Sequence, residues 1–349
     1  MAEGRRTRVL SSVVLALACP IAFACSLAFG ETVTFSLPEL LSGGTGNGLD
    51  VVDARVFELR LGRALVATAV GAALALSGAL LQGLFRNPLA SPSVLGVTSG
   101  AALGASLALV ILGGLGPASL LRVASGMPLV FVPAAAFIGA IAVTLVLLAI
   151  GSRGASSSML LLCGIGLASL CGGLVQTVQS IVLSDWELSA SITAWSFGSL
   201  EDRSWVHAVP VAIPVVLALG AVPFVHRELD LLAYGEDDAR ALGVRARLLR
   251  IEVIVLSSLL SASAVAIAGQ IAFIGLVVPN FVRLLLGVRH GRLLPITALS
   301  GGTLLLVVDL LQRTLLATTS LQPGALLSLV GAPVFLLLII LERRGQGSW

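Results

Sequence analysis

Long apolar runs recur along almost the whole chain, and they constrain the fold more than any other feature. A helix needs about 20 apolar residues to cross the hydrocarbon core of a bilayer. Ten segments come close to this length, with loosely defined ends: residues 9–29, 60–84, 94–113, 128–150, 158–183, 205–224, 249–269, 271–287, 294–316 and 325–341. Only 11% of the 349 residues are charged, against about 25% in soluble domains. We therefore expect an all-α membrane protein, a ten-helix polytopic bundle that forms one transmembrane domain over residues 1–349.

Arginine placement indicates the orientation of this bundle. All 21 basic residues are arginines, and the chain contains no lysine. With both termini in the cytoplasm, the inner loops and flanks hold fifteen arginines and the outer ones hold six, which agrees with the positive-inside rule. The first span follows three arginines, as a signal peptide would, but its run is long and no clear A-x-A site closes it. We expect a retained helix with a cytoplasmic N-terminus.

A charged stretch interrupts the apolar pattern at residues 227–250, "RELDLLAYGEDDARALGVRARLLR", with five arginines and five acidic residues. Within it, Gly235 and Gly243 bracket "EDDARAL", whose acidic N-terminal end suits a helix dipole. This pattern predicts a short helix on the cytoplasmic side, within a loop over residues 225–248. A solvated, arginine-rich loop and a docking element for a cytoplasmic partner both remain open on the pattern alone.

Two further segments concern the membrane interior. The run "ATAVGAALALSGALLQG" (67–83) carries Gly, Ala and Ser at close spacing, which lets helix backbones approach tightly in lipid. The segment "LFRNPLASPSVLGVTSGAALGA" (84–105) breaks a span with two prolines and restarts on small residues. Irregular backbone at membrane depth survives only where protein buries it or water lines it. The sequence therefore predicts a compact bundle with a translocation pathway beside residues 84–105.

Four ordered motifs resemble the FecCD-like permease subunits of type II ABC importers for ferric siderophores, haem and cobalamin. They are "RLGRALVATAVGAALALSGALLQGLFRNPLASPSVLGVTSGAALGA", "GEDDARALGV" (235–244), "GQIAFIGLVVPNFVRLL" (269–285) and "LVGAPVFLLLI" (329–339). The resemblance covers about residues 55–342. It implies ten helices in each of two permease subunits, either two copies or paralogues, two cytoplasmic ABC ATPase subunits, and an extracytoplasmic substrate-binding protein. It also implies the inner (plasma) membrane of a bacterium.

The resemblance assigns roles to three groups of residues. "GEDDARALGV" corresponds to the family's coupling helix, which sits in a cleft of the ATPase, so Glu236, Arg240 and Gly243 are expected to couple to it. Arg60, Arg63 and Arg313 are expected to dock the binding protein. Asn87 and Leu89 match positions that narrow the cytoplasmic exit, and Ser156 and Ser157 match the second layer of that gate.

Alternative interpretations remain open for two of these groups of residues. Interfacial snorkelling or lipid-phosphate anchoring is the alternative for the outer arginines, and a plain polar turn is the alternative for the serines. Asp309 lies one helical turn before Arg313, in an orientation that suits an i,i+4 ion pair. One position departs from the family pattern: many members have Pro-His where this chain has Pro279-Asn280.

The resemblance also indicates the energy source of transport and the class of compound that is transported. A P-loop requires a lysine, so a lysine-free chain contains none, and ATP and Mg²⁺ belong to the partner ATPase. We expect no cofactor, metal site or catalytic residue in this chain, and no nucleic-acid partner. An iron–siderophore complex is the expected cargo, with haem or cobalamin as the alternative. An ion-coupled secondary transporter would need acidic residues deep in the bundle, whereas Asp309 and Glu252 lie near span ends.

Overall fold

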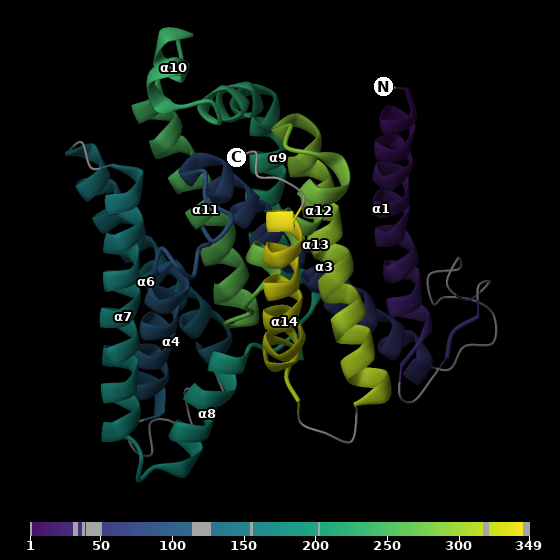
Figure 1. Ribbon diagram of the computed structural model, residues 1–349. Coiled ribbons are helices and arrows are strands. Elements are labelled where there is room, and N and C mark those ends of the chain that lie inside the picture. The colour runs from purple at the N-terminus through teal and green to yellow at the C-terminus, as the bar shows by residue number, and fades with distance from the viewer. Residues whose placement is uncertain are drawn as a thin grey trace.

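The computed structural model describes residues 2–30, 34–36, 39, 51–113, 127–153, 156–201, 203–316 and 321–344. Each regular element in these ranges is an α-helix (Figure 1). In chain order they are α1 (Ala2–Ala28), α3 (Val51–Phe85), α4 (Val97–Gly113), α6 (Met127–Ser152), α7 (Ser157–Ile181), α8 (Trp186–Phe197), α9 (Trp205–Leu232), α10 (Glu236–Ala241), α11 (Ala246–Ala268), α12 (Ile274–Leu286), α13 (His290–Leu315) and α14 (Pro323–Arg344).

Ten of these helices coincide with the ten predicted spans, which confirms the all-α fold class. Seven of the described helices are long and apolar enough to cross a membrane, whereas Val97–Gly113, Ile274–Leu286 and Pro323–Leu338 are shorter apolar helices. The count of ten is therefore approximate: it consists of seven full spans and three short ones. The division predicted at Gln270, between the seventh and eighth spans, is confirmed, because α11 ends at Ala268 and α12 begins at Ile274.

Several predicted boundaries were wrong because hydropathy reports only the apolar part of a helix. α3 begins at Val51 rather than at residue 60, and α9 continues to Leu232 rather than ending at residue 224. Charged residues occupy both extensions, and they continue the backbone hydrogen bonding without contributing to an apolar run. The predicted loop over residues 225–248 is correspondingly shorter: the chain leaves helix only between Leu232 and Ala246, and α10 lies inside that interval.

α8 was not predicted, although its start and end signals are present in the sequence. Asp185 caps its first turn by accepting a hydrogen bond from the Leu188 amide at 3.1 Å. Gly198, with a φ of +70°, follows its last residue. A capping aspartate before an apolar run and a glycine after it are the expected boundary signals of a helix. At twelve residues α8 is too short to span a bilayer, so a search for spans alone passes over it.

α3 forms the centre of the bundle. It packs against α13, α9, α11, α12 and α1, whereas α4 packs mainly against α6 and α7, and α11 connects the two groups by contacting α6 and α4. Figure 1 shows α4, α6 and α7 on one side of the bundle and α1 on the other. α10, the start of α1 and the end of α14 point to one end of the bundle, which we call the α10 end.

Glycines allow α3 to approach its neighbours closely, as the small-residue pattern of residues 67–83 predicted. A Cβ atom on Gly71 would lie 2.2 Å from the carbonyl oxygen of Gly301 on α13, and one on Gly301 would lie 2.3 Å from the carbonyl oxygen of Gly71. Such distances are far below van der Waals contact, so each of these two positions requires the absence of a side chain. The tight packing of small residues is the main source of helix association in lipid.

Two irregular segments lie in the interior beside one another. Residues 86–96 separate α3 from α4, and residues 269–273 separate α11 from α12. Gln270 donates a hydrogen bond to the Thr98 carbonyl at 3.4 Å, and both segments line a cavity of about 90 Å³. Ala90 and Leu95 are almost fully buried. The inner part of the broken segment predicted at residues 84–105 is therefore enclosed by protein, as irregular backbone at membrane depth requires, whereas Arg86, Leu89 and Ser93 are exposed.

Candidate functional site

The short helix α10 lies outside the bundle of spans, and four of its six residues are charged. The Glu236 carboxylate holds it in place by accepting hydrogen bonds from Arg240 at 2.7 Å and from Arg250, on α11, at 3.1 Å. Ala239 is fully buried where α10 packs against α9. The Arg240 side chain is 59% exposed and Leu242 is 65% exposed. α10 is thus tethered on one side and presents its other side outward.

Gly243 lies where the sequence predicted the end of this helix. α10 ends at Ala241, and Gly243 follows with a φ of +89°, a backbone conformation that residues with a Cβ rarely adopt. Its amide donates to the Arg240 carbonyl at 3.0 Å, which satisfies one of the carbonyl groups left over at the helix end. The turn sends the chain directly into α11 at Ala246. The structure therefore brings Glu236, Arg240 and Gly243 together in one small element.

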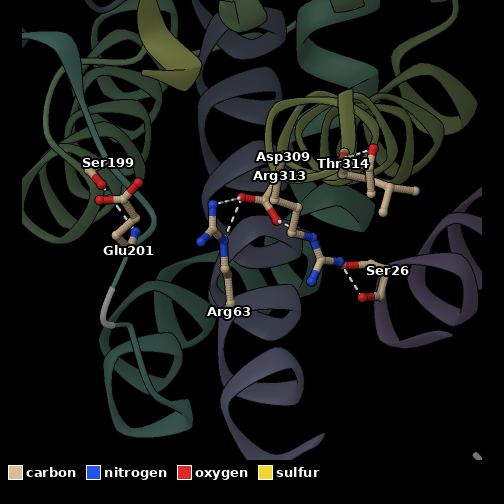
Figure 2. A network of polar contacts seen from close by, with 8 residues as sticks. Ser26, Arg63, Ser199, Glu201, Asp309, Arg313 and Thr314 are labelled. Atoms are coloured by element: carbon tan, nitrogen blue, oxygen red, sulfur yellow. Dashed lines mark hydrogen bonds and ion pairs between the residues drawn. The ribbon is translucent and has the colours of Figure 1, made fainter. Parts of the chain in front are cut away.

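A cluster of arginines occupies the opposite end of the bundle (Figure 2). The Arg63 side chain on α3 contacts Asp309 Oδ1 on α13 through both Nε and Nη2, each at 2.7 Å. Arg313 Nε lies 3.6 Å from the other oxygen of Asp309, so the predicted i,i+4 ion pair is present. Arg313 Nη2 also donates to the Ser26 hydroxyl on α1 at 2.7 Å. The fully buried Asp309 carboxylate thereby connects three helices.

Arg60 belongs to the same end but faces α1. Its Nη1 donates to the Leu27 carbonyl at 3.1 Å and to the Ala28 carbonyl at 3.3 Å, and its guanidinium lies 5.2 Å from the centre of the Phe35 ring. Only 7% of Arg60 is exposed. A guanidinium on an aromatic face gains cation–π attraction in addition to its hydrogen bonds. Arg60 therefore stabilises the junction of α1 and α3.

The three predicted docking arginines share one cavity of about 350 Å³, which is lined by Val56, Leu59, Arg60, Arg63, Glu201, Arg203 and Arg313. Arg203 and Glu201 were not singled out from the sequence. Their signal was the charged run Glu-Asp-Arg at residues 201–203, in the outer loop between two spans. Four arginines line this cavity, and Glu201 and the buried Asp309 offset part of their charge, so the balance is positive. An acidic side chain from a partner would fit its charge, whereas the buried parts of Arg60 and Arg313 already serve the fold.

Asn87 and Leu89 lie in the irregular segment that follows α3. Arg86, with a φ of +48°, ends that helix, and the Asn87 side chain accepts a hydrogen bond from the Leu89 amide at 2.9 Å. Leu89 is 47% exposed, so its side chain projects from the turn rather than packing into the core. The structure thus joins these two predicted gate residues in one compact turn.

The predicted second gate layer has a local structural role. The Ser156 hydroxyl caps α7 by accepting a hydrogen bond from the Met159 amide at 3.2 Å, and Ser157 is the first residue of that helix. This geometry is that of an ordinary helix N-cap. Within the described part of the chain, no hydrogen bond joins either serine to Asn87 or Leu89. The gate role of the serines stays a prediction that rests on the resemblance.

Asn280, which departs from the family pattern, makes contacts that reach the first gate layer. Its side-chain amide donates to the Pro88 carbonyl at 3.1 Å and to the Leu276 carbonyl at 2.9 Å, and its oxygen accepts from Arg283 at 2.8 Å. Arg283 also donates to the fully buried Gln82 on α3 at 3.1 Å. This network of Gln82, Asn280 and Arg283 ties α3, α12 and the Asn87–Leu89 turn together. Its sequence signal was the presence of polar side chains inside apolar spans.

The surroundings of Asp309 and Glu252, the acidic residues near span ends, show whether they could bind the coupling ion of a secondary transporter. Asp309 is fully buried, but Arg63 and Arg313 compensate its charge. Glu252 lies on the exposed side of α11. Binding of a coupling ion needs a buried acidic group whose charge the protein leaves available. Neither of these two carboxylates has that character.

Comparison with known proteins identifies the family. Residues 18–341 match the FecCD transport family. The chain is 41% identical to the hemin transport system permease protein HmuU of Yersinia pestis, over 83% of this chain and 84% of that protein. It is 38% identical to the Fe(3+) dicitrate transport system permease protein FecD of Escherichia coli, over 82% of this chain and 86% of that protein.

A solved structure agrees with this match. The fold is similar to that of a metal-chelate type ABC transporter in an inward-facing conformation, with a TM-score of 0.80, 34% identity, and coverage of 94% of this chain and 98% of that one. The chain belongs to the FecCD transport family, and it is a multi-pass permease subunit of a type II ABC importer.

Proposed function

We propose that this permease moves an iron–siderophore complex across the inner (plasma) membrane of a bacterium, with both termini in the cytoplasm. A substrate-binding protein delivers the complex to the outer face, and two ABC ATPase subunits bind the cytoplasmic face. A second permease subunit, identical or paralogous, completes the pathway. The relatives that carry a ferric chelate or haem support iron as the transported element.

The observation that carries the proposal is the geometry of α10. A helix of six residues stands outside the spans, is tethered by Glu236 to α11, and exposes Arg240. An ATPase that grips this helix pushes directly on α11, because Gly243 and the following turn leave few residues between the two. α11 in turn contacts α3, α4, α6 and α9. Movement of α10 is thereby transmitted to the helices around the interior.

The opposite end suits the arrival of the binding protein. Arg60, Arg63 and Arg313 line a positively charged cavity there, together with Arg203. We propose that acidic side chains of the binding protein enter this cavity. Charge complementarity of this kind orients two proteins and accelerates their encounter more than it adds affinity. Because Asp309 already neutralises part of the cluster, the exposed edge of Arg63 is the proposed point of contact.

The pathway requires a gate but no tight substrate site in this chain. We propose that Asn87 and Leu89 form the cytoplasmic constriction, that Ser156 and Ser157 form a second layer, and that Asn280 holds the first layer in place through Pro88. The chain uses no cofactor of its own in this scheme, and ATP and Mg²⁺ act on the partner ATPase.

The test is ligand-dependent ATP hydrolysis by the complete complex. The permease is reconstituted in nanodiscs with its ATPase and binding protein, and the rate is measured with a panel of ferric siderophores, with haem and with cobalamin. We expect stimulation by a ferric siderophore and none by its iron-free form. Stimulation by haem or cobalamin alone would overturn the siderophore assignment, and a complex that transports with no ATPase present would overturn the ABC mechanism.

Haem is the second candidate substrate, and one observation favours it. The relative from Yersinia pestis, which is named a hemin permease, shares 41% of its residues with this chain over most of both proteins. The same panel separates the two substrates, because haem presents a flat, largely apolar macrocycle whereas a ferric siderophore presents a polar, globular chelate.

A further inference from the structure

A second polar cavity lies at the α10 end of the bundle, next to the start of the irregular segment 86–96. Its volume is about 400 Å³, and it is lined by Gln82, Gly83, Arg86, Asp230, Ala233, Tyr234, Arg283, Val288, Arg289 and His290. Each of these residues lies near a helix end: the end of α3, the end of α9, or the turn between α12 and α13. The cavity is therefore enclosed by three helix ends at the same height.

The cavity is rich in positive charge. Arg283 is 8% exposed and is held in a fixed position by hydrogen bonds to Gln82 and Asn280. Arg86 and Arg289 are exposed, and within the described part of the chain neither has a side-chain hydrogen bond or an ion-pair partner. Three guanidinium groups thus surround one space, and the fork of each matches the oxygens of a phosphate group.

One wall of the cavity holds the single carboxylate of the lining, and that group is occupied. Asp230 Oδ1 accepts from the His290 amide at 2.9 Å and lies 2.7 Å from His290 Nδ1. The other ring nitrogen, Nε2, is buried and has no hydrogen-bond partner among the described residues. Asp230 therefore orients the imidazole against Gly83, and its own hydrogen bonds go to His290 rather than to the three arginines.

The position of the cavity relative to the bilayer indicates that the ligand is a lipid headgroup. Arg86 directly follows the apolar span Val52–Phe85. We therefore place the end of α3 at the boundary between the hydrocarbon core and the headgroups. Tyr234 is 79% exposed and Val288 is 53% exposed at the cavity mouth, which provides an aromatic ring and an apolar surface next to the guanidinium groups. Basic pockets of this kind between helix ends suit lipid headgroups.

We propose that this cavity binds the phosphate of an anionic phospholipid headgroup from the inner leaflet. Arg86 and Arg289 hold the phosphate oxygens at the mouth, Arg283 attracts them from the interior, and Tyr234 and Val288 lie against the glycerol and the first part of the acyl chains. The proposal does not depend on the transported substrate. It requires only that the α10 end lies at the inner surface of the membrane. Through Arg283 and Asn280, a bound lipid stabilises the turn that contains Asn87 and Leu89.

The test measures lipid retention by the purified permease with native mass spectrometry in detergent. Phosphatidylglycerol and phosphatidylcholine with identical acyl chains are titrated against the native chain and against Arg86→Gln/Arg289→Gln. Both side chains are exposed and make no side-chain bonds, so the variant is expected to fold. Arg153→Gln serves as the matched control, because Arg153 is exposed near the same end but does not line the cavity.

We expect the native chain to prefer phosphatidylglycerol, and the double variant to lose affinity for it by roughly fivefold for each arginine removed. Arg86→Lys/Arg289→Lys, which keeps the charge, should retain most of the affinity, and Arg153→Gln should retain all of it.

Equal retention by the native chain and the double variant would overturn the proposal. Displacement of the lipid by millimolar inorganic phosphate would reassign the cavity to free phosphate. A double variant that keeps its lipid but no longer binds the ATPase would assign it to that interface instead.

Discussion

At the scale of single residues, Asp309 is the most consequential charge in the bundle. It is fully buried, and Arg63 and Arg313 both depend on it for a counter-charge. Asp309→Asn removes the negative charge and leaves two guanidinium groups facing each other, at a cost of about 3–5 kcal/mol, as for other broken buried pairs. We expect a large fall in thermal stability in detergent. Glu58→Gln, which breaks the exposed Arg55–Glu58 pair, is the matched control and should cost less than about 1 kcal/mol.

The two variants also differ in their response to salt. Added salt screens the exposed pair but reaches the buried one poorly. The destabilisation caused by Asp309→Asn should therefore persist between low and high ionic strength. A small effect of Asp309→Asn, comparable with that of Glu58→Gln, would contradict a structural role for the cluster and would leave docking as its only function.

Asn280 is the second residue whose contacts lead to a prediction. Asn280→Ala removes the donor to the Pro88 carbonyl and one acceptor of Arg283, and each buried group left unsatisfied costs about 1–3 kcal/mol. Because Pro88 lies between Asn87 and Leu89, we expect the constriction to loosen. Basal ATP hydrolysis by the assembled complex should rise while substrate uptake falls.

Two further variants serve as comparisons for the ATP hydrolysis and substrate uptake of Asn280→Ala. Asn280→His introduces the residue common in the family, and it should retain more uptake than Asn280→Ala if a side-chain donor at this position is what matters. Ser263→Ala is the control, because the Ser263 hydroxyl bonds only to a carbonyl of its own helix. An Asn280→Ala complex with native coupling between hydrolysis and uptake would show that this network does not act on the gate.

At the scale of structural elements, α10 depends on the backbone geometry of Gly243. Its φ of +89° disfavours any residue with a Cβ, although a Cβ would meet no atom within 4 Å. Gly243→Val therefore acts through backbone strain of about 1–2 kcal/mol rather than through a clash. We expect normal membrane abundance and normal binding of the external protein, but loss of ATPase association or of transport-coupled hydrolysis.

Gly243→Asn is the matched variant, because asparagine tolerates a positive φ better than valine does. It should retain most of the coupling. Co-purification with the ATPase and uptake into vesicles are the measurements. Full ATPase binding and native uptake by Gly243→Val would mean that residues 235–244 form only a solvated loop.

The crossing of α3 and α13 depends on a different property of glycine, its small size. A Cβ on Gly301 would lie 2.3 Å from the Gly71 carbonyl oxygen, so Gly301→Val must push the two helices apart. We expect a strong loss of thermal stability and of folded yield. Gly220→Val on α9 places the same side chain where nothing lies within 4 Å, and because valine has a slightly higher helix propensity than glycine it should leave stability unchanged or slightly raised, by less than about 1 kcal/mol. Similar losses in the two variants would contradict close packing at Gly71 and Gly301.

At the scale of the whole molecule, the last prediction concerns which subunit of the complex hydrolyses ATP. The chain contains no lysine, and therefore no P-loop, so the purified permease should hydrolyse no ATP. Hydrolysis should begin when the ATPase is added, and it should depend on Arg240 and Gly243 of the permease. A phosphate-release assay on the permease before and after addition of the ATPase checks this. Turnover that persists after every other subunit is removed would contradict the proposal.

Local chemistry was enough to predict the ten apolar helices and the short helix α10 between two of them, although α8 was not predicted. A run of apolar residues determines a span by itself, and two glycines around "EDDARAL" determine a short helix, because hydropathy, helix dipole and glycine conformation act within a few residues. The small-residue run at 67–83 likewise predicted close packing of α3. The helix ends were less well predicted, because charged extensions such as Val51–Leu59 continue a helix without adding hydropathy.

The long-range partners of the polar and charged residues were decided by tertiary structure alone. The sequence placed Asp309 beside Arg313, one helical turn away, but its shorter contact is with Arg63, which is 246 residues away in the chain. Asn280 meets Pro88 across 192 residues. Such contacts depend on which faces of two helices meet, and glycine pairs such as Gly71 and Gly301 determine how closely they do so. A one-dimensional pattern shows that an arginine lies near an outer end, but only the packed bundle determines whether it faces a partner or stabilises the fold.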